Sequence, residues 1–301
     1  MKENGISRSI ISISSPGTVL TTNDPIHAVQ TTTYCNDYAA NLKKEHPDKF
    51  GFWASLPLPH VDLALAEIER AARLGADGYA LLTNVQGHYL GDEIFDRVFD
   101  ELNKRHATVF IHPTTPCMLC STPAPSGSKE TYLKVPPLGR KYPSPMFEFF
   151  FDTARMLTNL FHSGTVARTP NIRFVIPHLG GAMPPLLSRT AGFSAIVPES
   201  LALSQDQVKE TLNRQFYFDL AGFAFPMQFV GLVDGVGIQR DRLVYGSDYP
   251  FTPAPLVKKL ARELEVGLSE AFGSDRDEAY KILAENAEEL LQAQRKQRAN
   301  M

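Results

Sequence analysis

Seven short runs of mostly apolar residues recur along this chain, and each run is followed by a turn signal. In most of them the apolar residues are consecutive rather than alternating with polar ones, which is typical of strands buried on both faces of a parallel sheet. The runs therefore predict seven buried strands. They are residues 9–14 (SIISIS), 50–57 (FGFWASLP), 78–84 (GYALLTN), 107–113 (ATVFIHP), 172–181 (IRFVIPHLGG), 216–222 (FYFDLAG) and 242–250 (RLVYGSDYP).

Segments with helical periodicity lie between these runs. Val61–Leu74 and Asp92–Lys104 each place their apolar residues on one stripe and most charged residues elsewhere, as an amphipathic helix does. Strands and helices thus alternate, which predicts a right-handed α/β series, either doubly wound or closed into a barrel. Further helices are expected at Pro25–Lys44, Pro145–Ala167, Gln205–Asn213, Pro255–Leu264 and Asp275–Gln294.

The number of strands and the length of the chain bear on the choice between these folds. The chain has 301 residues, and a single α/β barrel of about 250 residues fits that length. A closed barrel of this type needs eight strands, one more than the seven runs supply. The opening residues MKENG are typical of a last helical turn ending before Gly5. We therefore expect one barrel domain over residues 1–301, with the first strand absent.

Two segments differ from the regular alternation. Residues 114–144 are rich in Pro, Ser and Gly and follow the fourth run. They are too long for an ordinary strand-to-helix connection, so we expect an active-site loop or lid there. Residues 275–301 are expected to form a C-terminal helix and a solvated tail.

Composition and charge exclude several classes of protein. Hydrophobic residues make up 43% and charged residues 21%, which fits a soluble globular protein rather than a disordered chain. The 30 basic and 33 acidic residues give a net charge of −3, so no basic excess indicates nucleic acid or a membrane surface. The apolar runs are too short to span a bilayer. Cys35, Cys117 and Cys120 are too few for a disulfide scaffold, which favours a cytoplasmic location.

Three polar residues end three of the predicted strands at the same register. They are His112, His178 and Asp248. In α/β barrels the active site lies at the carboxyl ends of the strands, so these side chains are expected to converge on one mouth. Two imidazoles and a carboxylate suit zinc or a similar divalent metal, or acid–base chemistry. The alternative is that each residue only closes its strand with a hydrogen bond.

Other residues with chemical potential have an equally simple structural explanation. A C-x-x-C pair lies in the Pro-rich segment, but a redox motif would open a helix in a thioredoxin-like unit. Two histidines follow strand ends and are more typical of solvated loops. Two aromatic residues are candidates for stacking on an aromatic ring or for ordinary core packing. These residues are Cys117 and Cys120, His60 and His88, and Trp53 and Phe251.

The strand-end motifs carry a specific resemblance. The successive motifs FIHP, IPHLGGAMP and YGSDYPF resemble the metal-dependent decarboxylase branch of the amidohydrolase superfamily. That branch includes aminocarboxymuconate-semialdehyde decarboxylase and decarboxylases of hydroxybenzoates such as γ-resorcylate. Residues 146–181 are most similar to the fungal 6-methylsalicylate and orsellinate type. The resemblance covers nearly the whole chain and implies a TIM-barrel-like amidohydrolase fold.

The resemblance implies a role for each strand-end residue. His112 matches a metal-binding histidine, and His178 matches the catalytic histidine that orients or moves a proton. Asp248 matches a metal-binding aspartate and is also a candidate catalytic proton donor. Arg189 matches an arginine that in some members holds a substrate carboxylate in a neighbouring subunit's site; the alternative is a surface arginine. The family further implies zinc or manganese, no organic cofactor and a homodimer.

The implied activity is non-oxidative decarboxylation of a hydroxylated aromatic acid resembling 6-methylsalicylate, in polyketide secondary metabolism. The family carries two further ligands in an H-x-H or E-x-H pair on its first strand, and this sequence has no such pair. His112 and Asp248 alone are fewer than the three or four protein ligands that hold catalytic zinc. An incomplete sequence, an inactive paralogue that binds an aromatic acid, and substitute ligands are the competing explanations. Metal-assisted hydrolysis of a lactone or amide is the alternative reaction.

Overall fold

Seven parallel strands form the central sheet of this chain in a computed structural model. The model describes residues 1–20, 24–124, 127–193, 196, 203–273 and 276–299. All seven predicted strands are confirmed. They are β1 (Ser9–Ile11), β2 (Phe50–Ser55), β3 (Gly78–Leu82), β6 (Thr108–His112), β9 (Arg173–Ile176), β10 (Phe216–Asp219) and β11 (Leu243–Val244).

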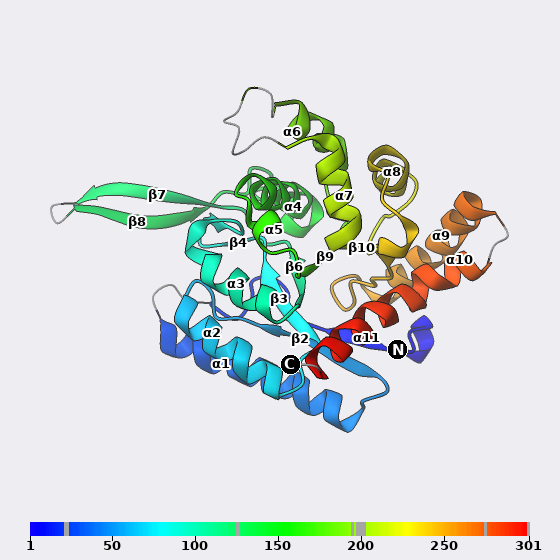
Figure 1. The fold of residues 1–301 in the computed structure, drawn as a ribbon, viewed down its shortest axis with the longest axis horizontal. Helices are drawn as coiled ribbons and strands as arrows, with labels where there is room; N and C mark the ends of the chain where they lie inside the picture. The colour runs from blue at the N-terminus through cyan, green and yellow to red at the C-terminus, as the bar shows by residue number, and fades with distance from the viewer. Residues whose placement is uncertain (21–23, 125–126, 194–195, 197–202, 274–275, 300–301) are drawn as a thin grey trace.

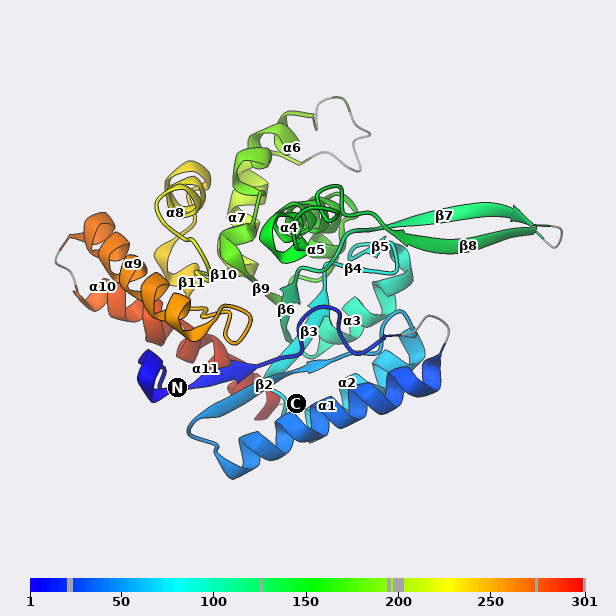
Figure 2. The ribbon, with the colours of Figure 1, turned by 180° about the vertical axis from the view of Figure 1, so that it is seen from behind.

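The sheet keeps the order of the strands in the chain, β1-β2-β3-β6-β9-β10-β11, and every neighbouring pair is parallel. The sheet curls as a barrel does, with helices outside it and the C-terminal helix against its inner face (Figures 1 and 2). Its two outer strands, β1 and β11, do not pair with each other, and no strand among the described residues joins them. The fold is therefore a seven-stranded, open α/β barrel, as the strand count predicted.

Helices follow the strands and cover the outer face of the sheet. Expected helices are found at α1 (Pro25–Glu45), α2 (Val61–Arg73), α3 (Asp96–Lys104), α4 (Ser144–His162), α5 (Thr165–Arg168), α7 (Gln205–Gln215), α9 (Ala254–Phe272), α10 (Arg276–Tyr280) and α11 (Asn286–Ala299). The remaining helical elements are α6 (Leu187–Phe193), α8 (Met227–Val230), η1 (Lys2–Asn4), η2 (Glu93–Phe95), η3 (His178–Gly180), η4 (Pro184–Leu186), η6 (Gly231–Val236), η7 (Arg240–Arg242) and η8 (Lys281–Glu285).

Two hydrophobic clusters stabilise the sheet from its two faces. The larger one fills the space between the sheet and the surrounding helices. The smaller one lies inside the curl, where Phe110, Val175 and Tyr217 of three strands meet Leu290 of the C-terminal helix α11. Since α11 contributes to this inner cluster, it covers part of the barrel interior (Figure 2). The continuous apolar runs of the sequence follow from this burial on both faces.

Several boundaries differ from the expectation. The helix expected over 145–167 is divided at Gly164, whose φ of +77° lies outside the helical region. The helix expected over 255–264 continues to Phe272. Residue 275, the first of the expected C-terminal segment, and residues 300–301 at its end lie outside the described residues. The opening turn η1 ends before Gly5 at φ +69°, as predicted.

The segment 114–144, expected to be an active-site loop or lid, contains regular secondary structure. It contains β7 (Cys117–Ala124) and β8 (Gly127–Lys134), which form an antiparallel ribbon, while β4 (Asn84–Val85) pairs with β5 (His88–Tyr89) near its base. The ribbon projects from the body of the molecule (Figures 1 and 2). Thr131 and Tyr132 have high β propensity, which outweighed the surrounding turn-forming residues.

No helix within the described residues has the length and apolar character needed to cross a membrane.

Candidate functional site

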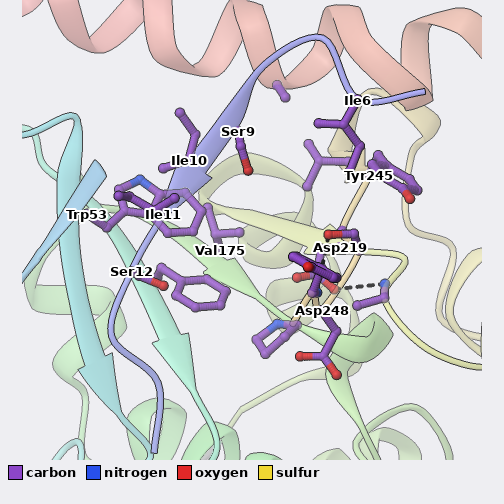
Figure 3. Close-up of a pocket in the computed structure, with 18 of the residues that line it drawn as sticks. Ile6, Ser9, Ile10, Ile11, Ser12, Trp53, Val175, Asp219, Tyr245 and Asp248 are labelled. Atoms are coloured by element: carbon purple, nitrogen blue, oxygen red, sulfur yellow. Dashed lines mark hydrogen bonds between the residues drawn. The ribbon is translucent and has the colours of Figure 1, made fainter. Parts of the chain in front are cut away.

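A cavity of about 460 Å³ lies along the open side of the barrel. Residues of β1 and the chain after it form one wall, and residues 244–251 form the opposite wall. The C-terminal helix closes one end with residues such as Leu290 and Leu291. Figure 3 shows Ile10, Ile11 and Trp53 on one side of the cavity and Asp219 and Asp248 on the other. The cavity therefore reaches from the gap between the two unpaired outer strands into the curl of the sheet, where Trp53, Phe110 and Val175 also line it.

His112, His178 and Asp248 all line this one cavity. His112 ends β6, His178 begins η3 directly after β9, and Asp248 follows β11. Parallel strands bring their carboxyl ends to one edge of the sheet, which is why residues far apart in the sequence meet here. The structure thus brings the three side chains to one cavity, but not at one register. His112 ends its strand, whereas His178 and Asp248 lie in the segments that follow theirs. The structure does not test the role of each residue.

His112 is buried and held in one orientation. Its Nδ1 lies 2.6 Å from the carbonyl oxygen of Pro113, so Nε2 is the nitrogen left to face the cavity. The ring of Phe149 packs edge-on against the imidazole, with centroids 5.9 Å apart. Burial, together with the nearby His178, lowers the pKa of His112 to about 4. The imidazole is therefore neutral at neutral pH, the form in which it can accept a proton or coordinate a metal.

His178 sits at a backbone position that side chains rarely adopt. Its φ is +55°, and that of the following Leu179 is +50°. The imidazole stacks on Phe150 of α4, with ring centroids 5.5 Å apart. Burial lowers the pKa of His178, and the Asp248 carboxylate works against that shift. Non-glycine residues with positive φ cluster at functional sites, where the surrounding structure holds them in place.

Asp248 also has a left-handed backbone, with a φ of +52°. One of its carboxylate oxygens, Oδ2, accepts a hydrogen bond of 3.0 Å from the hydroxyl of Thr252. The backbone N–H of Thr252 donates to the Asp248 carbonyl oxygen at 2.8 Å. Thr252 therefore orients both the backbone and the side chain of Asp248.

Asp219 is a site residue that the sequence analysis missed. It is the last residue of β10, it is 9% exposed, and it lines the same cavity. Burial raises the pKa of this carboxyl to about 7, and the nearby Asp248 adds to the shift. A signal was present in the sequence, because Asp219 is an acidic residue within an otherwise apolar strand run, FYFDLAG.

Aromatic side chains form much of the remaining wall. Trp53 of β2 stacks on Phe110 of β6, with ring centroids 4.6 Å apart, and both line the cavity. Phe251 also lines it and is 67% exposed. An aromatic wall beside polar strand ends suits a flat, apolar ligand that carries a few polar groups. Trp53 is the only tryptophan in the chain, which makes its fluorescence a report on this cavity.

Arg189 and the other candidates, two cysteines and two histidines, do not line the cavity. Arg189 is an exposed residue of α6, its guanidinium lies over the ring of Phe193 at 4.6 Å, and it is not among the residues lining the cavity. Cys117 and Cys120 are free thiols on β7. His88 Nδ1 lies 2.8 Å from an Asp92 carboxylate oxygen, and His60 precedes α2. None of the four lines the cavity.

The cavity does not contain a complete set of metal ligands. Within the part of the chain that the structure describes, no group of three or more His, Cys, Asp or Glu side chains is arranged to hold a metal ion. Catalytic zinc is normally held by three or four protein donors, and the resemblance assigns only His112 and Asp248 to that role. The donors are of the right chemical type, but their number does not fit a resident metal.

Comparison with known proteins identifies relatives. A family model described as Amidohydrolase matches residues 1–293. The decarboxylase yanB of Aspergillus niger is 32% identical over 293 residues, which are 95% of this chain and 75% of that protein. The 6-methylsalicylic acid decarboxylase acuB of Aspergillus aculeatus is 32% identical over 301 residues, which are 98% of this chain and 84% of that protein.

A solved structure confirms the fold. The crystal structure of a 5-carboxyvanillate decarboxylase from Novosphingobium aromaticivorans, with bound manganese, has a TM-score of 0.80 and 24% identity to this chain. The match covers 97% of this chain and 79% of that one. The expected barrel-like α/β architecture is therefore confirmed.

Proposed function

The chain belongs to the amidohydrolase family, as its strand-end motifs predicted, and we propose that it is a carbon–carbon lyase that decarboxylates a hydroxylated aromatic acid. The observation that carries this proposal is the convergence of His112, His178 and Asp248 on one aromatic-lined cavity. Two fungal relatives that are 32% identical to the chain are decarboxylases, which supports the reaction type.

The reaction requires one proton and the loss of one carbon dioxide. A proton is added to the ring carbon that bears the carboxylate, which breaks the aromaticity of the ring. The bond from this carbon to the carboxylate then breaks, its electron pair stays with the ring, and aromaticity returns. His178 orients or moves this proton, and Asp248 is the candidate donor. The aromatic wall around Trp53 holds the flat ring and excludes water.

The metal enters the proposal only as a prediction. Manganese is bound in the decarboxylase structure that shares this fold, and the resemblance assigns His112 and Asp248 as ligands, with zinc or manganese as the ion. Because the described residues do not form a metal site on their own, no step above is routed through a metal. No organic cofactor is proposed.

The proposed substrate rests on the relatives, and the proposed subunit arrangement rests on the position of Arg189. We propose a substrate resembling 6-methylsalicylate, used in secondary metabolism, because a relative that is 32% identical acts on that acid. We propose a homodimer in which Arg189 contacts the substrate of the partner subunit, since Arg189 is exposed and lies away from its own cavity. The three free cysteines support a cytoplasmic location. Residues 1–301 act as one barrel domain in this proposal.

Metal content and product analysis test this function together. The purified chain is loaded with zinc or manganese, desalted and analysed for metal, and then incubated with 6-methylsalicylate or orsellinate. We expect release of carbon dioxide and the decarboxylated phenol. Opening of a lactone or amide without carbon dioxide release would assign the chain to the hydrolases instead.

One observation favours a second candidate, a non-catalytic protein that binds an aromatic acid. The described residues lack a group of three metal-binding side chains. Quenching of Trp53 fluorescence by 6-methylsalicylate without any product in a metal-loaded sample would support this candidate. Turnover of either acid would exclude it.

A further inference from the structure

Asp219 occupies a central position among the strand ends of the site. Its strand, β10, lies between β9 and β11, and these neighbours lead into the segments that carry His178 and Asp248. We propose that Asp219 is a positioning residue that holds both segments in the arrangement the reaction needs. This inference rests on the proposed function for its kinetic consequences but not for its structural ones.

Asp219 holds the His178 segment through its backbone. A single carboxylate oxygen, Oδ1, accepts hydrogen bonds from the N–H of His178 at 2.9 Å and from the N–H of Ala221 at 3.0 Å. His178 and Leu179 are both left-handed, a conformation that persists only where surrounding contacts hold it. The hydrogen bond to His178 N–H is such a contact, and the stacked ring of Phe150 restrains the imidazole itself.

Asp219 holds the Asp248 segment through close packing. The chain passes the carboxylate at Gly246, where an added Cβ would lie 2.8 Å from Asp219 Cγ and 3.0 Å from Oδ2. Real Cβ atoms essentially never approach other atoms so closely. Glycine at this position therefore lets the chain lie directly against the carboxylate, and the left-handed Asp248 follows two residues later. Figure 3 shows Asp219 and Asp248 on the same side of the cavity.

A second aspartate provides a matched comparison outside the site. Asp77 is also buried, accepts the backbone N–H of Phe52 at 3.0 Å and lies against Gly51, where an added Cβ would be 2.6 Å from Asp77 Oδ2. It precedes β3 and therefore lies at the opposite edge of the sheet. A purely structural role for Asp219 predicts that the two aspartates respond alike to substitution.

The test compares Asp219→Ala, Asp219→Asn and Asp77→Ala in the full chain. Decarboxylation of 6-methylsalicylate is measured well below each melting temperature. We expect Asp219→Ala to lower kcat/KM by about 100-fold, because small misplacements of reacting groups have effects of that order. Asp219→Asn should recover most of this loss, since the amide oxygen can accept the same two N–H groups. Asp77→Ala should leave kcat and KM unchanged. Equal loss in the two Asp219 variants, or wild-type kinetics in Asp219→Ala, would overturn the proposal.

Hydrogen exchange measured by mass spectrometry tests the positioning role of Asp219 independently of the proposed function. We expect Asp219→Ala to speed amide exchange in residues 177–182 and 246–250, whereas Asp219→Asn should leave it close to that of the wild type. Asp77→Ala should instead speed exchange around residues 50–52. If the wild type has no activity but this exchange pattern holds, the function fails and the positioning role stands. Unchanged exchange in both segments of Asp219→Ala would overturn the positioning role whatever the activity.

Discussion

Asp219 and Asp77 place the same side chain against a glycine at opposite edges of one sheet, but the charged groups around them differ. Asp77 is paired with Lys43, whose Nζ lies 2.6 Å from its carboxylate. Asp219 accepts two backbone N–H groups, has Asp248 nearby, and no lysine or arginine pairs with it among the described residues. At the amino ends of the strands (the amino edge), Lys43 compensates the buried carboxylate of Asp77. At the carboxyl ends (the carboxyl edge), Asp219 has no such cation in the described part of the chain, and its pKa is raised to about 7. Burying a carboxylate without a cation costs stability, and groups with shifted pKa values cluster where chemistry is performed.

The largest expected effect is on turnover, from a substitution at the carboxyl edge. His178→Gln removes the imidazole that we propose orients or moves the proton, while the glutamine side chain still fills much of its space. Loss of an acid–base group costs about 100-fold to 10,000-fold in rate. We therefore expect kcat to fall within that range, as measured by carbon dioxide release.

The matched control is His88→Gln, because His88 lies outside the cavity and pairs with Asp92. Its kcat should stay at the wild-type value. A full-rate His178→Gln variant would show that the carboxyl edge is not the catalytic one.

The next-largest effect is a difference in substrate binding between substitutions at Gly246, beside Asp219, and at Gly51, beside Asp77. Gly246→Ala pushes a methyl group against Asp219, and Gly51→Ala pushes one against Asp77 and the side chain of Ile10. Both variants should lose stability, since overpacking costs about 1–3 kcal/mol. Gly246→Ala should weaken binding of 6-methylsalicylate, as measured by quenching of Trp53 fluorescence, more than Gly51→Ala, whose methyl group reaches the cavity only through the side chain of Ile10. Equal affinity in the two variants would remove the distinction between the two edges.

A smaller effect is expected from the ion pair at the amino edge. Asp77→Asn keeps an acceptor for the Phe52 N–H but leaves Lys43 Nζ without its carboxylate. A hydrogen bond to a charged group contributes about 1.5–3 kcal/mol, so we expect the free energy of unfolding in urea to fall by up to that amount. Binding of 6-methylsalicylate should not change. A shifted affinity in this variant would mean that the two edges are coupled.

The sequence predicted the strands because burial on both faces leaves a continuous apolar signal, as in β6 and β9. The convergence of His112, His178 and Asp248 followed from their places at or after the carboxyl ends of strands, since parallel strands end at one edge. The same rule applied to Asp219, but its strand end FYFDLAG lacks a histidine or a recognised motif, and the residue was overlooked.

Other features were beyond sequence reasoning. The ribbon of β7 and β8 depends on pairing between residues far apart in the sequence, such as Cys117 with Lys134, and composition alone predicted a loop or lid. The place of Arg189 depends on how α6 packs, which no local pattern specifies. Asp219 and Gly246 belong to different strand ends and are close only in the folded chain. Neither residue therefore has a local sequence pattern that predicts this contact.

The smallest expected effect is a pH dependence of stability that arises from Asp152. This residue is intermediate between Asp219 and Asp77, because a cation lies near its carboxylate but farther away than Lys43 is from Asp77. This buried residue of α4 accepts hydrogen bonds from Thr83, Asn84 and Tyr89, and the guanidinium of Arg155 lies 3.8 Å from its carboxylate. Burial raises the pKa of Asp152 and outweighs these hydrogen bonds, which lower it. Between the ordinary and the raised pKa the folded chain holds a proton that the unfolded chain has released, so stability falls as the pH rises.

Asp152→Asn removes this titration while keeping the shape of the side chain. The melting temperature of the wild type minus that of Asp152→Asn should therefore decrease as the pH rises from the ordinary aspartate range through the raised pKa, and level off above it. Differential scanning calorimetry across that range measures the difference. A difference that increases with pH would mean that the three hydrogen bonds and Arg155 outweigh burial. The carboxyl edge would then compensate its charges as the amino edge does with Lys43, and the contrast between the edges would be confined to Asp219.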